Sequence, residues 1–212
     1  MHTLWVFAIS IDTVRGIFRA DDALAERLRN VAAADFPPPG APERRGLFHK
    51  LGPLLRRQPA DRIDPDSPTP ADMHAVLVGG YIAPQRLYPS WRLFISWLKE
   101  LSQAYRRLEI ADLDGLEFNL ALAGLSSQYA LRHLAHRQLG TPLKPLGNQL
   151  AGYSKHFHVV ETKRALDEVE ATLEGKPADV LAQVSGVRDI LSVAAGSPGL
   201  DVVVVEEPPK RS

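Results

Sequence analysis

The chain has 212 residues, of which 45% are hydrophobic, so it is long enough to bury a sizeable core. Its 25 basic and 25 acidic side chains cancel, which argues against a protein-wide field for a membrane surface or nucleic acid, and we expect no nucleic-acid partner. Cysteine is absent, which excludes disulfides, thiolate metal ligands and a cysteine nucleophile and fits a cytoplasmic location. No apolar run approaches the roughly 18 residues of a transmembrane helix.

The N-terminal region predicts a strand followed by two helices. Residues 4–10 form a short apolar run rich in β-formers, which indicates a strand covered on both faces and not a signal peptide. Asp12 is a candidate cap for a first helix. Asp21 or Asp22 then begins a second helix, which we expect to continue to about Ala34.

A proline-rich irregular insertion is expected at about 36–70, within a single domain that spans 1–212. Four prolines and a glycine between positions 37 and 42 interrupt regular structure. The insertion contains a leucine-rich stretch with arginine pairs at its ends: Arg44, Arg45, Arg56 and Arg57. Three interpretations remain open: a loop that packs its leucines on the domain, a docking segment for an acidic partner or nucleic acid, and a membrane-surface segment.

Helical patterns dominate the middle of the chain. Thr69 followed by Pro70 is typical of a helix start, because the hydroxyl caps and proline suits the first helical position. Aromatic and aliphatic residues at three- and four-residue steps predict a long core helix from about Ala83 to Leu108. Asp112 is then a candidate cap for a further helix.

The stretch 126–140 predicts the most polar helix of the chain. Two serines precede it, and a glycine and a proline follow it. His133 and His136 would share one face, with Arg132 and Arg137 beside them. This face has three interpretations: a solvated rim, a binding site for an anion or a partner, and a metal-binding histidine pair.

Two further histidines and the C-terminal strand complete the pattern. His156 and His158 would share a face if residues 152–160 formed a strand, and they could then join the other histidine pair. Amphipathic helices are expected at 161–173, after Asp179 and at 187–195. The valine-rich run at 200–205 predicts a strand.

Both ends of the chain resemble the YfbM-like group of bacterial proteins of unknown function. The resemblance rests on the sequence Ile-Asp-Thr-Val-Arg-Gly-Ile at 11–17 and on residues 190–200, which lead into the final strand. It implies an α+β domain with both terminal strands in one small sheet, and it implies no activity.

We therefore expect an α+β fold, mainly helical, with N- and C-terminal strands paired in a small sheet. No Gly-x-Ser-x-Gly, phosphate-loop or dinucleotide motif is present, so the sequence indicates no catalytic residue, metal or cofactor. The leading hypothesis is a non-catalytic binding or regulatory protein acting through a protein partner. Its candidate binding residues are Arg44, Arg45, Arg56, Arg57, Arg132, His133, His136 and Arg137. The alternative is a metal-dependent or other hydrolase that uses the histidines with an acid such as Asp112.

Overall fold

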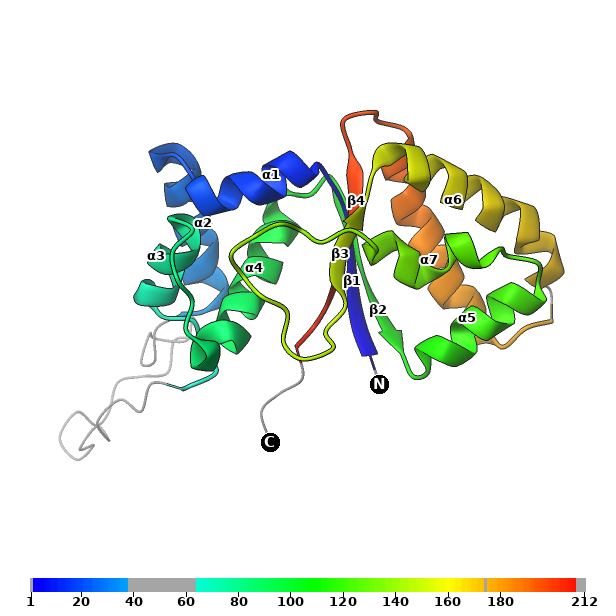
Figure 1. The fold of residues 1–212 in the computed structure, drawn as a ribbon, viewed down its shortest axis with the longest axis horizontal. Helices are drawn as coiled ribbons and strands as arrows, with labels where there is room; N and C mark the ends of the chain where they lie inside the picture. Colours follow the sequence, from blue (N-terminus) through cyan, green and yellow to red (C-terminus); the bar gives the residue numbers. More distant parts are fainter. Residues whose placement is uncertain (1, 38–63, 174, 209–212) are drawn as a thin grey trace, which may run out of the picture.

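The computed structural model describes residues 2–37, 64–173 and 175–208. They form a four-stranded antiparallel sheet with helices on both faces (Figure 1), which confirms the predicted α+β class. The strand order is β2-β1-β4-β3. The strands are β1 (His2–Ile9), β2 (Ala104–Ile110), β3 (Ala151–Ser154) and β4 (Asp201–Glu206).

The two terminal strands lie side by side at the centre of the sheet, as predicted. In the antiparallel register of β1 and β4, Val6 is opposite Val204 and Phe7 is opposite Val203. Both runs are buried on both faces, because successive side chains of a strand point into opposite helical layers. This double burial explains why neither run alternates with polar residues.

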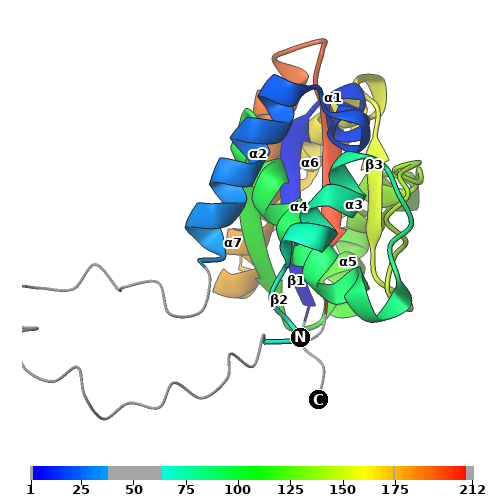
Figure 2. The ribbon, with the colours of Figure 1, turned by 90° about the vertical axis from the view of Figure 1, so that its left-hand side faces the viewer.

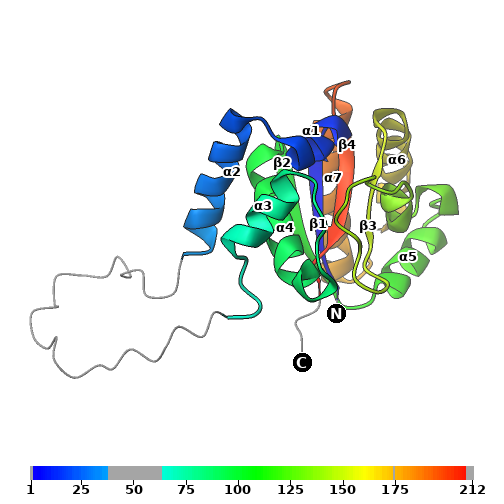
Figure 3. The ribbon, with the colours of Figure 1, turned by 60° about the vertical axis from the view of Figure 1, so that its left-hand side comes forward.

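One layer contains the helices from the N-terminal half of the chain. Figures 2 and 3 show these helices in front of the sheet. They pack on Trp5 and Phe7 of β1 through Trp91, Phe94 and Trp97, all three fully buried. The elements of this layer are α1 (Ile11–Gly16), the 3-10 turn η1 (Ile17–Arg19), α2 (Asp22–Asp35), α3 (Pro70–Leu77), the 3-10 turn η2 (Pro84–Arg86) and α4 (Leu87–Leu101).

The opposite layer contains the C-terminal helices. Leu4 and Val6 of β1 pack there against the helix α7 (Ala178–Ala195). The sequence predicted two helices in this region, one after Asp179 and one at 187–195, but the structure has one continuous helix. The elements of this layer are α5 (Leu113–Leu122), the 3-10 turns η3 (Ser127–Tyr129) and η4 (Leu131–Ala135), α6 (His156–Val169), the 3-10 turn η5 (Glu170–Leu173) and α7 (Ala178–Ala195). Among the described helices, none combines the length and the apolar character that crossing a membrane requires.

Two predicted helix starts are confirmed by their caps. Asp21 accepts a hydrogen bond from the Leu24 amide, and Thr69 and Asp72 form a reciprocal capping box. The prediction for α1 was wrong by two residues, because Ser10 caps it and Asp12 lies in its first turn.

The predicted helix from 83 to 108 was wrong at its C-terminal end. Helix α4 stops at Leu101, and Ser102 is extended, with φ −77° and ψ 149°. The following residues form β2, which pairs with β1 along seven residues from His2 opposite Ile110 to Ala8 opposite Ala104. A long-range partner therefore overrides the local helical pattern.

The carboxylate of Asp201 connects the sheet to both helical layers. At the start of β4, it accepts hydrogen bonds from the Ile11 amide at 2.9 Å and from the His156 amide at 3.2 Å. Ile11 and His156 are the first residues of α1 and α6, and the N–H groups at the start of a helix have no acceptor within the helix. Lys155 adds an ion pair at 3.2 Å, and the Asp201 side chain is only 6% exposed.

We predict that Asp201→Ala lowers the free energy of unfolding by about 3 kcal/mol, because two amides lose their acceptor. Asp201→Asn keeps one oxygen acceptor and should lose less. Denaturant unfolding of both variants measures the difference. Wild-type stability in Asp201→Ala would contradict the connecting role of this carboxylate.

Candidate functional site

The predicted binding residues fall into two groups. Arg44, Arg45, Arg56 and Arg57 lie outside the described residues, so their part of the hypothesis stays a prediction. The other four lie in the segment 126–140, where the single predicted helix was wrong. That segment forms η3 and η4, separated by an extended Ala130 with ψ 150°, and then runs along the edge strand β3.

Pairing with β3 explains why this segment is not an α-helix. Arg137 and Tyr153 exchange backbone hydrogen bonds of 3.3 and 2.9 Å, and the Ser154 hydroxyl donates to the His133 carbonyl at 3.0 Å. A Cβ added to Gly152 would lie 2.1 Å from the Ala135 carbonyl oxygen, so the two backbones approach too closely for any side chain.

The four described candidates make different local contacts. Arg132 pairs with Asp114 and Glu117 of α5, and Asp114 raises the pKa of this guanidinium. Arg137 donates from Nε to His136 Nε2 at 3.2 Å. Arg132 therefore contacts α5, whereas His136 and Arg137 contact each other, and the role of the four residues in binding stays a prediction.

His136 of one predicted histidine pair contacts His158 of the other pair. His156 and His158 lie in the first turn of α6 and not on a strand, so the prediction of a shared face was wrong. The His158 ring contacts the edge of His136 at 5.3 Å between centroids and stacks on Tyr129 at 5.8 Å. Burial, followed by the nearby His136, lowers the pKa of His158.

The hydrogen bonds of this cluster offer no base for the buried hydroxyl of Ser154. His136 Nδ1 lies 2.6 Å from the His133 carbonyl oxygen, which can only accept, so Nδ1 carries the hydrogen. It therefore cannot take a proton from Ser154, whose Oγ lies 3.4 Å away. In the described part of the chain, no three histidine or acidic side chains gather as metal ligands.

The lowered pKa of His158 predicts a pH-dependent stability. Below its usual value of 6.5 the unfolded chain takes up the proton more readily than the folded protein, so stability falls as the pH decreases. Between about pH 7.5 and 5.5, His158→Gln should lose less stability than the wild type. His74→Gln, at an exposed position on α3, is the control. Equal pH dependence in wild type and His158→Gln, measured by denaturant unfolding, would contradict this assignment.

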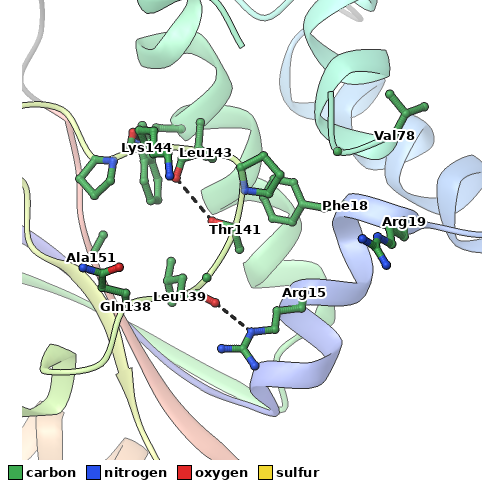
Figure 4. Close-up of a pocket in the computed structure, with 15 residues that line it drawn as sticks. Arg15, Phe18, Arg19, Val78, Gln138, Leu139, Thr141, Leu143, Lys144 and Ala151 are labelled. Carbon is green, nitrogen blue, oxygen red and sulfur yellow. Dashed lines mark hydrogen bonds between the residues drawn. The ribbon is translucent and has the colours of Figure 1, made fainter. Parts of the chain in front are cut away.

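A cavity lies on the opposite face of the sheet, where the chain continues from Arg137. Its volume is about 940 Å³. It lies between η1, the end of α3, α4 and the loop 138–145 (Figure 4). The lining residues are Arg15, Phe18, Arg19, Val78, Gly79, Trp91, Gln138, Leu139, Gly140, Thr141, Pro142, Leu143, Lys144, Pro145 and Ala151.

Three contacts fix the walls of this cavity. Arg15 donates from Nε to the Leu139 carbonyl at 2.9 Å (Figure 4), and buried Trp91 donates from Nε1 to the Lys144 carbonyl at 2.9 Å. Gly79 has φ +65°, and a Cβ there would lie 2.7 Å from the Phe18 carbonyl oxygen. The loop and the two helical segments are therefore held in place by backbone groups as well as by packing.

Positive charge is concentrated around the cavity. Arg15, Arg19 and Lys144 line it, and no acidic side chain is among its lining residues. Most other described arginines and lysines form ion pairs, such as Arg27 with Glu100 at 2.7 Å. With the described residues, neither Arg19 nor Lys144 forms an ion pair.

This site was not predicted from the sequence. The four-residue spacing of Arg15 and Arg19 was a usable signal, since residues at that spacing share a helix face. Lys144, by contrast, lies in an irregular loop, and only the folded chain places it on the same cavity as the two arginines.

Comparison with family models, curated proteins and solved structures finds no significant match to this chain. The resemblance to the YfbM-like group therefore stays a prediction.

Proposed function

We propose that this chain is a non-catalytic binding protein whose cavity takes a small anionic ligand. The observation that supports the proposal is the arrangement of Arg15, Arg19 and Lys144 around one cavity without a lining carboxylate. Cationic side chains without an acidic neighbour attract and retain anions, because their charge is not already compensated.

The size and composition of the cavity support a small molecule. About 940 Å³ is within the range of ligand sites, which are lined mainly by apolar side chains with a few polar groups. Phe18, Trp91, Leu139 and Leu143 are buried beside the cavity and supply its apolar part.

The lining residues support binding more than chemistry. Thr141 supplies their one hydroxyl, which donates to the Leu143 carbonyl at 3.4 Å. Among the described residues that line the cavity, there is no histidine, aspartate or glutamate to act as a general base. The rival hydrolase hypothesis uses the histidines with an acid such as Asp112. Among these histidines His136 and His158 are in contact, and the Nδ1 of His136 cannot act as a base for Ser154.

The regulatory part of the hypothesis concerns a protein partner. Capture of that partner by Arg44, Arg45, Arg56 and Arg57 remains a proposal that is independent of the cavity. A cysteine-free chain is compatible with the cytoplasmic location that we also propose.

Inorganic tripolyphosphate is a suitable probe for the cavity. At about one hundred times its Kd, it should stabilise the fold by about 2.7 kcal/mol, which corresponds to roughly 5–10 °C in Tm. The double variant Arg19→Glu/Lys144→Glu should lose this stabilisation, since both cations become anions. Thermal unfolding with and without the probe measures it.

Arg29→Glu is the matched control, because Arg29 is exposed on α2 and does not line the cavity. It should keep the stabilisation. Equal stabilisation of the double variant and the wild type would contradict the proposed function.

A further inference from the structure

We infer that the ligand of this cavity is an organic phosphate, a phosphate monoester attached to an apolar body. The inference rests on the proposed function and adds the chemical class of the ligand. It follows from two properties of the cavity: the number of uncompensated cations and the apolar surface beside them.

The charge of the site requires more than one negative charge from its ligand. Arg15, Arg19 and Lys144 supply three positive charges, and no lining carboxylate offsets any of them. A carboxylate would neutralise one, whereas a phosphate monoester carries about −1.5 to −2 at pH 7. Arginine also suits phosphate geometrically, because its planar guanidinium can donate two parallel hydrogen bonds.

The cations line the cavity from two segments. Arg15 and Arg19 belong to the helical wall, and Lys144 belongs to the loop on the other side of the cavity (Figure 4). The Nε of Arg15 is already used by the Leu139 carbonyl, which leaves its two terminal nitrogens as donors. Within the described residues, no hydrogen bond uses a donor of the Arg19 or Lys144 side chain.

The apolar surface of the cavity fits the remainder of the ligand. Val78, at the end of α3, lines the cavity with 56% of its surface exposed. Pro142 and Pro145 are exposed on the loop that forms the opposite wall. Covering this surface removes apolar area from water, so an organic phosphate should bind more tightly than inorganic phosphate.

Isothermal titration calorimetry with four probes tests the inference on the full chain. Phenyl phosphate has both features, inorganic phosphate lacks the apolar body, benzoate carries a single charge, and phthalate is a dicarboxylate. We expect phenyl phosphate to bind at least roughly tenfold more tightly than benzoate or inorganic phosphate. Its affinity should also rise with pH through about 6, where the second phosphate proton is lost, whereas benzoate binding should stay constant.

Substitutions of the lining cations test whether phenyl phosphate binds in this cavity. Arg19→Gln and Lys144→Gln should each weaken phenyl phosphate binding about fivefold, and Arg29→Gln should leave it unchanged. Benzoate or phthalate binding as tightly as phenyl phosphate would overturn the phosphate assignment and leave the proposed anion-binding function intact. No binding of any probe up to about 5 mM, or binding that both variants leave unchanged, would overturn the proposed function together with the inference.

Discussion

The arrangement of the two helical layers depends on the hydrogen bonds that the buried carboxylate of Asp201 accepts. It lies at the start of the central strand β4 and binds the first amides of α1 and α6, which cover opposite faces of the sheet. A carboxylate suits both helix starts, because their N–H groups and dipoles favour negative charge. One side chain therefore sets where both layers begin, and α1 in turn carries Arg15 to the cavity.

The cavity results from the path of the chain between η4 and β3. Residue 137 pairs with the sheet edge, the next residues cross to the other helical layer, and Leu139 and Leu143 pack there with Trp91. Hydrogen bonds from Arg15 and Trp91 to loop carbonyls hold this crossing loop. Because these contacts fix the loop and the helical wall, a ligand would not have to order this part of the backbone, which limits the entropy lost on binding.

The sequence predicted features with strong local signals and missed those that depend on distant partners. The apolar runs at 4–10 and 200–205 identify the central strands, and the capping box at Thr69 identifies α3. Strand β2 was missed because its charged edge residues gain their conformation from β1. The segment 126–140 was misassigned because β3 takes the backbone groups that a helix would need. The cavity was missed because only the folded chain places Lys144 of the loop and the two helical arginines around one cavity.

Mapping the binding site by NMR would test the central claim most directly. Titration of isotopically labelled protein with phenyl phosphate should shift the backbone amides around the cavity, with the largest changes at Arg19, Gly79 and Gly140. The amides beside the contact between His136 and His158, on the opposite face of the sheet, should change little. The largest changes at that histidine contact, or shifts spread without relation to the cavity, would contradict the account.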